Sequence, residues 1–113
     1  MPSVSRQFQD FILDLLAPLD PTARRMFGGA GLFHGGVMFG LLVRDTFYLR
    51  VDDRTREQYE RAGSTAFSYM RGDRMVSIAA YYAVPEALLD QPDELLPWAR
   101  DAFAAARAVK RRR

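Results

Sequence analysis

The side chains best suited to acid–base chemistry are the single histidine, His34, and two adjacent carboxylates, Asp52 and Asp53. A histidine metal site would need carboxylates for all its other ligands, and His34 stands beside Gly35 at an expected hairpin end, where polar residues are ordinary. Adjacent acids at the start of a helix usually cap it by accepting backbone hydrogen bonds. The sequence therefore predicts no catalytic residue and no enzyme.

The glycines between residues 28 and 40 resemble nucleotide-binding loops only in part. The run from Gly29 begins like a dinucleotide fingerprint, but it has His34 in place of the third glycine and leads into a strand pattern. The spacing from Gly31 to Gly36 suits a phosphate loop, yet the required lysine and serine or threonine do not follow. Cysteines are absent, which removes thiolate metal sites. We expect no cofactor and no metal.

Aromatic and basic residues together suggest a nucleic-acid surface, because aromatic rings on a sheet can stack bases. The aromatic residues in the strand patterns are Phe27, Phe33, Phe39, Phe47, Tyr48, Phe67, Tyr69, Tyr81 and Tyr82. The candidate nucleic-acid contacts are Arg24, Arg25, Lys110, Arg111, Arg112 and Arg113. Basic residues between the aromatics are sparse and strand aromatics are mostly core, so nucleic-acid binding stays an alternative hypothesis.

The basic charge of the sequence belongs to its C-terminal end. The chain has 16 basic and 14 acidic side chains and a net charge of +2, and four of the basic ones are residues 110–113. Without that tail the chain is slightly acidic, so its body is not expected to bind phosphates strongly on charge alone. A run of four basic residues is more often a solvated terminus.

Two helical patterns bracket the first group of strands. The first begins at Ser5, a good N-cap residue, shows one wide apolar stripe, and ends at Pro18. The second begins after Asp52 or Asp53, whose carboxylates suit a helix start, and ends just before Gly63. Each predicted helix has one apolar side, so each is expected to cover another element.

A third helix is expected near the C-terminus. It begins between Asp93 and Pro97, because proline is tolerated only near a first turn. Trp98 is the largest side chain on its apolar stripe. We expect Trp98 to be largely buried against the sheet with Leu95 and Ala102.

Short apolar runs separated by turn residues predict antiparallel strands at residues 24–33, 37–43, 46–51, 66–70 and 75–84. Gly28-Gly29 marks a bulge or bend within the first strand, and Gly35-Gly36 a tight hairpin turn. The order is α-β(3)-α-β(2)-α, which is typical of an α+β domain, a two-layer α/β sandwich with helices on one face of an antiparallel sheet. A chain of 113 residues forms one such domain.

Three segments of the sequence resemble the N-terminal domain of the TfoX family of competence regulators: RRMFGGAGLFHGGVMFGLL, FYLRVDDRTREQYERAGSTAFSY and YYAVPEALL. The resemblance runs from about residue 24 to about residue 106. It implies the same α-β(3)-α-β(2)-α fold, similar to type III secretion chaperones, and a role in regulating natural transformation genes in bacteria, without a recognised catalytic site. Longer members continue into a C-terminal helical domain, so we expect the domain assignment to transfer more safely than the process.

The resemblance favours a non-enzymatic regulatory module that acts through contacts with a protein partner in the control of competence gene expression. The alternatives are a nucleic-acid-binding transcriptional regulator, using the sheet aromatics and the basic tail, and a chaperone-like protein that binds peptides. We also expect a homodimer with a two-fold contact through the strand region or the first helix, because symmetric pairs are the commonest oligomers.

A cytoplasmic location is expected, without a membrane partner. Residues 1–4 do not begin a basic and then apolar leader, and no run approaches the roughly 18 apolar residues that span a bilayer. The absence of cysteines suits a reducing compartment.

Overall fold

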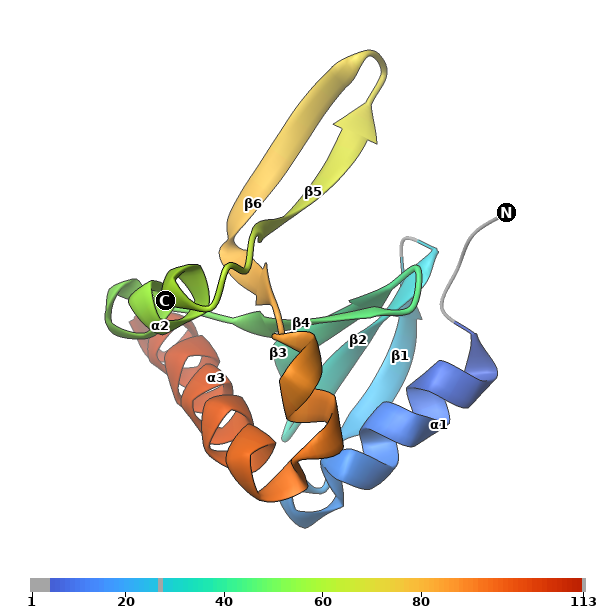
Figure 1. Ribbon diagram of the computed structural model, residues 1–113, viewed down its shortest axis with the longest axis vertical. Coiled ribbons are helices and arrows are strands. Elements are labelled where there is room, and N and C mark those ends of the chain that lie inside the picture. The colour runs from blue at the N-terminus through green and yellow to red at the C-terminus, as the bar shows by residue number, and fades with distance from the viewer. Residues whose placement is uncertain (1–4, 27, 113) are drawn as a thin grey trace.

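A computed structural model describes residues 5–26 and 28–112, with side chains up to Val109. Within this range the chain forms three α-helices, two short 3-10 helices and one six-stranded antiparallel sheet (Figure 1). The helices are α1 (Arg6–Leu15), η1 (Ala17–Leu19), α2 (Asp53–Arg61), η2 (Glu86–Asp90) and α3 (Pro92–Arg112). The strands are β1 (Thr22–Met26), β2 (Gly29–His34), β3 (Val37–Val43), β4 (Thr46–Arg50), β5 (Ala66–Arg71) and β6 (Arg74–Ala83). The segment 1–4, Phe27 and Arg113 lie outside the described residues.

Helices α1 and α3 lie on one face of the sheet, and over the described residues no helix lies on the other (Figure 1). The core fills the space between the sheet and these helices, and its largest fully buried side chains are Ile12, Leu16, Leu32, Phe39, Leu42, Leu49, Tyr59 and Leu95. Burying an aliphatic or Phe side chain stabilises a fold by about 1.5–3 kcal/mol. The predicted α+β class, with two layers and an antiparallel sheet, is confirmed.

The stretch predicted as a single bent strand at residues 24–33 is instead a hairpin of β1 and β2. Met26 pairs with Gly29, and Gly28 between them has φ of 76°. Such a left-handed conformation reverses the chain without strain only at glycine, so the glycine pair forms a turn rather than a bulge. The order is therefore α-β(4)-α-β(2)-α, one strand more than predicted. The register between β2 and β3 is irregular, because Leu32 pairs with Gly40 and Phe33 with Met38, which leaves Phe39 of β3 as an extra residue.

The predicted helix caps are confirmed. The Ser5 hydroxyl accepts a hydrogen bond from the Phe8 backbone N–H at 3.1 Å. At α2 the Asp52 carboxylate accepts from the Thr55 N–H at 2.9 Å, while the Thr55 hydroxyl accepts from the Asp52 N–H at 3.1 Å. Burial raises the pKa of Asp52, but the hydrogen bonds from Thr55, together with the charge and the backbone hydrogen bond of Arg54, outweigh it and hold that pKa below its usual value. Gly63, with φ of 81°, follows the end of α2.

Helix α3 begins at Pro92, before the predicted range, and Pro97 lies inside it. Its backbone stays helical through Arg112, so the expected basic tail continues the helix as far as the described residues extend. Over the described range, no helix combines the length and the apolar composition needed to cross a membrane.

Trp98 lies at the border of the apolar stripe of α3. The centre of the stripe is formed by Leu95, Ala99 and Ala102, which are fully buried at spacings of four and three residues. Trp98 is partly buried, and its ring meets the Tyr59 ring of α2 edge-on at 4.7 Å between centroids. The aromatic ring that Trp98 contacts therefore belongs to helix α2 rather than to the sheet.

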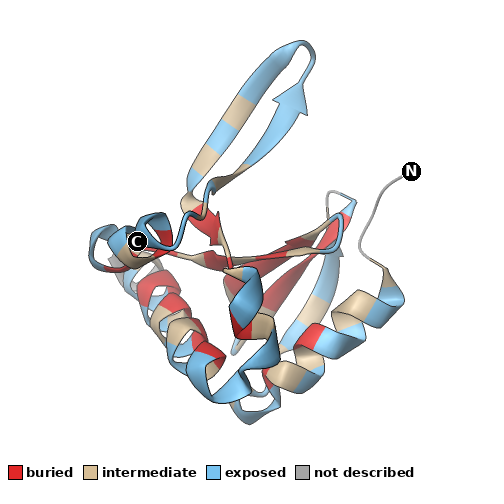
Figure 2. Ribbon diagram, in the orientation of Figure 1, coloured by how far each residue is buried: buried red, intermediate tan, exposed pale blue. Residues whose placement is uncertain are grey.

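Strands β5 and β6 extend beyond the sheet as a two-stranded ribbon (Figure 1). Strand β6 pairs with β4 only through Tyr81–Ala83, whereas residues 67–71 pair with residues 74–78 alone. We call residues 67–78 the arm. Figure 2 shows that its residues are exposed or intermediate, while the buried residues lie in the body of the domain.

Candidate protein-contact surface

Two adjacent rows of paired residues show which side chains face away from the helices. One row is Arg25, Ala30, Leu42 and Phe47, and its last three members belong to the core under α1 and α3. The next row is Arg24, Gly31, Leu41, Tyr48 and Ala83. Because successive side chains of a strand point to opposite faces, this second row lies on the uncovered face of the sheet. We call that surface the outer face.

The outer face is apolar around Gly31. A Cβ atom on Gly31 would lie 2.8 Å from the Met38 sulfur, 2.9 Å from the Phe33 ring and 3.1 Å from the Met26 sulfur. Two thioethers and one ring thus close over a position that has no side chain of its own. Leu41, paired with Gly31, is buried but is not part of the core cluster beneath the helices. The sheet therefore carries a second apolar surface on its outer face.

Arginines lie over aromatic rings of the outer face. The Arg24 guanidinium carbon is 4.9 Å from the centroid of the Phe33 ring, and that of Arg50 is 5.5 Å from the Tyr81 ring. A cation–π contact at an exposed site such as Arg24 contributes about 0.5–1 kcal/mol, whereas the Tyr81 ring under Arg50 is buried. Burial raises the pKa of Tyr81, and the neighbouring Arg50 opposes the rise. In each pair the planar guanidinium group thus covers a ring.

The charged side chains of the strands are all basic, and the acidic side chains lie in the helices and loops. Strands β1 to β6 contain no Asp or Glu, and their basic residues are Arg24, Arg25, Arg50, Arg71 and Arg74. Arg24 and Arg50 belong to the outer face, and Arg71 pairs with Arg74 at the end of the arm. Arg25, although adjacent to Arg24, lies in the row that faces the helices. The two strand arginines proposed as nucleic-acid contacts are therefore on opposite faces, and the side chains of residues 110–113 lie outside the described part.

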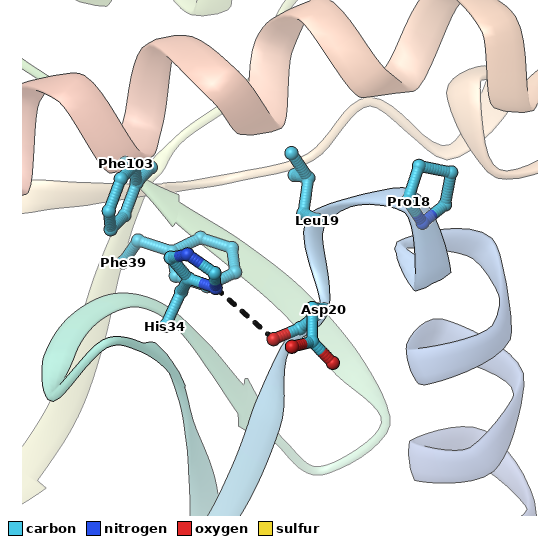
Figure 3. Close-up of a pocket in the computed structure, with 6 residues that line it drawn as sticks. All are labelled: Pro18, Leu19, Asp20, His34, Phe39 and Phe103. Atoms are coloured by element: carbon cyan, nitrogen blue, oxygen red, sulfur yellow. Dashed lines mark hydrogen bonds between the residues drawn. The ribbon is translucent and has the colours of Figure 1, made fainter.

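His34 is packed into a shallow hollow rather than standing free at a turn, which corrects the expectation of a plain turn histidine (Figure 3). The hollow has a volume of about 200 Å³ and is lined by Pro18, Leu19, Asp20, His34, Phe39 and Phe103. The His34 ring meets the Phe103 ring edge-on at 5.1 Å, and its Nδ1 is 3.2 Å from the backbone carbonyl oxygen of Asp20. These contacts fix β2 against η1 and α3, so His34 has a packing role.

Asp52 and Asp53, the other candidates for acid–base chemistry, both stabilise α2. Asp52 is the cap described above, and the Asp53 carboxylate pairs with the Arg56 guanidinium at 2.9 Å. Over the described residues, no three metal-ligating side chains converge.

Comparison with known sequences identifies the domain. Residues 14–106 match the family model of the TfoX N-terminal domain. The chain belongs to this family. The TfoX domain also matches the "DNA transformation protein TfoX1" of Aliivibrio fischeri, with 29% identity over 84 residues, which is 74% of this chain and 40% of that protein. The chain thus spans less than half the length of that relative. The outer face and the arm both lie within residues 14–106, which match the family model.

Sequence reasoning did not identify the outer face of the TfoX domain. Its members Met26, Phe33 and Met38 come from three strands and meet only over Gly31. The signal that could have found it is the absence of acids from every strand pattern, combined with the alternation of Arg24 and Met26 in β1. That alternation becomes informative only once the register with β2 is known.

Proposed function

We propose that this TfoX domain is a non-enzymatic regulatory module in the control of transformation genes, and that it acts by binding a protein partner on its outer face. The observation that carries the proposal is the Gly31-centred cluster of Met26, Phe33 and Met38, with the Arg24 guanidinium over the Phe33 ring. Aromatic residues, Met and Arg are enriched at protein interfaces, whereas Lys, Glu and Asp are depleted. The strands match both halves of that rule.

Methionine adds adaptability to this surface. Its side chain is unbranched and polarisable, so Met26 and Met38 can repack against different partner side chains. The process assigned here, control of transformation, is supported by the name of the relative TfoX1. A cytoplasmic location is part of the proposal, because the sequence has no cysteine that would suit an oxidising compartment.

The adjacent arginines provide a matched test of this proposal. Arg24→Glu reverses a charge on the outer face, whereas Arg25→Glu makes the same change on the face with the helices. Both variants and the parent chain are immobilised and exposed to bacterial lysate treated with nuclease. We expect a protein captured by the parent chain and by Arg25→Glu but lost with Arg24→Glu. Equal capture by all three would contradict a partner site on the outer face.

A second candidate function, nucleic-acid binding, is favoured by one observation. Basic residues lie on strands that hold no carboxylate: Arg24 on β1, Arg50 on β4, Arg71 on β5 and Arg74 on β6. Near them, the Tyr48 ring meets the Phe67 ring at 5.0 Å where the sheet and the arm join. Against it, the Phe33 and Tyr81 rings are already covered by arginines rather than open for stacking.

The second candidate has its own measurement. Fluorescence polarisation with a labelled single-stranded oligonucleotide, repeated at rising salt, would show an affinity that falls steeply with ionic strength if phosphates are bound. Under the protein-contact proposal, the oligonucleotide binds no more tightly to the parent chain than to Arg24→Glu.

A further inference from the structure

The arm contacts the body of the domain at its base, where the Phe67 ring meets the Tyr48 ring of β4 at 5.0 Å. Its residues pair only with one another, and a two-stranded ribbon in water is marginally stable at best. It nevertheless exposes large apolar side chains at its tip, where Tyr69 is 41%, Met70 56% and Met75 66% exposed. A ribbon with such a tip gains stability when a partner covers it.

Helix α1 carries the matching surface. Over the described residues, the one other exposed large hydrophobic side chain is Phe11, 41% exposed. Asp10 and Asp14 flank it on the exposed side of α1. Residues three and four positions apart share a helix face, so Phe11 and the two carboxylates form one patch.

The arm tip and the α1 patch are complementary in charge. Arg71 pairs with Arg74 in the β5–β6 register, beside Met70 and Met75. Asp73 lies between these two arginines in the turn, so the tip keeps an excess of one positive charge. In the described part of the chain, neither these arginines nor Asp10 and Asp14 belong to an ion pair.

The two patches of one chain cannot meet. The arm rises on the outer side of the sheet, while α1 lies on the opposite side and toward another edge (Figure 1). We propose that two copies of the chain associate about a two-fold axis, with the arm tip of each copy seated on α1 of the other. Two-fold symmetry makes this contact twice, so apolar Met–Phe burial and the Arg–Asp attraction are both doubled. The pairing goes beyond the proposed function and leaves the outer face of each copy for a different partner.

Charge reversal tests the pairing in both directions. One variant carries Arg71→Glu and Arg74→Glu, and the other carries Asp10→Arg and Asp14→Arg. Each alone places like charges at both contacts, and we expect its self-association to weaken about tenfold in sedimentation at micromolar concentration. Mixed together, the two variants have complementary charges at both contacts and should form a dimer again. A parent chain that stays monomeric, or a mixture that behaves like the separate variants, overturns the proposal.

The cysteine-free sequence allows a direct test of the geometry. Chains with Phe11→Cys and chains with Met75→Cys, distinguished by mass, are mixed and oxidised. A bridge between the two kinds of chain is expected, because a disulfide requires Cα atoms within about 7 Å. Ala87→Cys, at an exposed site of η2, replaces Met75→Cys in the control and should give little bridging. Bridges confined to identical variants would mean that another surface forms the dimer, and would overturn the proposal.

A double variant with both cysteines in one chain separates closed from open assembly. A two-fold dimer closes with two bridges and stops at twice the chain mass, whereas a head-to-tail contact continues into a ladder. The ladder would overturn the two-fold arrangement. Arg24→Glu, which tests the outer face, should dimerise like the parent chain, so failure of partner capture and failure of dimerisation are distinguishable.

Discussion

The two faces of the sheet use the same strands in different ways. Toward the helices, side chains such as Leu42 and Leu49 are fully buried under α3, and their packing is fixed. Toward the other side, Met26 and Met38 close over Gly31, and Arg24 covers a ring. The first face holds the fold together by burial. The second keeps apolar side chains near water, where flexible thioethers and guanidinium groups limit the exposed area without sealing it.

The largest expected contrast comes from two adjacent residues of β3. Phe39 is fully buried in the core, whereas Met38 is partly buried on the outer face. Phe39→Ala should lower the free energy of unfolding by about 3–5 kcal/mol, since it leaves a cavity. Met38→Ala should cost less than about 1.5 kcal/mol, because the site opens to solvent and the neighbouring Met26 can shift. Urea denaturation followed by Trp98 fluorescence measures both, and equal losses would show that the outer face is as tightly packed as the core.

Two glycines of β2 give the next contrast. A Cβ on Gly29 would collide with the backbone oxygen of Leu42, which cannot move without disturbing the sheet. A Cβ on Gly31 would meet the ends of the Met26 and Met38 side chains and the edge of the Phe33 ring, and these partly exposed side chains can shift. We expect Gly29→Ala to cost about 3 kcal/mol and Gly31→Ala about 1 kcal/mol, at opposite ends of the range for overpacking. Thermal melts of both variants test this order, and the reverse order would mean that the outer cluster is rigid.

The cap of α2 should have a smaller and pH-dependent effect. Asp52→Ala should cost about 1 kcal/mol, while Asp52→Asn should keep most of the stability because Asn also caps. The folded pKa of Asp52 lies below its ordinary value of 3.8, so the carboxylate contributes stability above that pH and loses it as the pH falls through the folded pKa. Denaturation at neutral pH and below pH 3.8 should show this loss in the parent chain, with less of it in Asp52→Asn. An identical pH dependence in both would assign the loss to other carboxylates.

The smallest effect on stability is expected at the C-terminal end. Removing residues 110–113 should leave the free energy of unfolding within about 0.5 kcal/mol of that of the parent chain, as for most surface changes. If these residues contribute only charge and solubility, the outer face alone decides partner binding, and capture by the shortened chain is unchanged. Retention on a DNA column that disappears on truncation, and returns when the segment is grafted onto another protein, would instead favour the nucleic-acid hypothesis.

Local chemistry explains why the helices could be predicted. Ser5, Asp52 and Gly63 act within three or four residues of where they stand, so the sequence holds the whole signal. The sequence does not predict the split between β1 and β2, because a glycine pair can form either a bulge or a turn. The choice depends on whether Thr22 and Ala23 find partners in Phe33 and Leu32.

The candidate surfaces were harder to predict because they depend on register. Arg24 and Arg25 are adjacent in sequence, and only the pairing with β2 separates their faces. The arm projects from the sheet because only Tyr81–Ala83 of β6 pair with β4. The amino-acid composition of β6 does not predict where this pairing stops. Likewise, His34 is packed because Phe103, far along the chain, reaches it.

A ribbon that stands away from the body is also the segment that a protease reaches first. Arg71 and Arg74 give trypsin two cleavage sites at the end of the arm. A cut there leaves the body intact, because β6 stays joined to β4 through Tyr81–Ala83 and the core lies elsewhere. The nicked chain would keep its fold and its outer face while losing the continuity of its arm. The rate at which trypsin cuts the arm in limited digestion thus measures the fraction of chains whose arm is covered. That fraction can be followed as the protein concentration is changed.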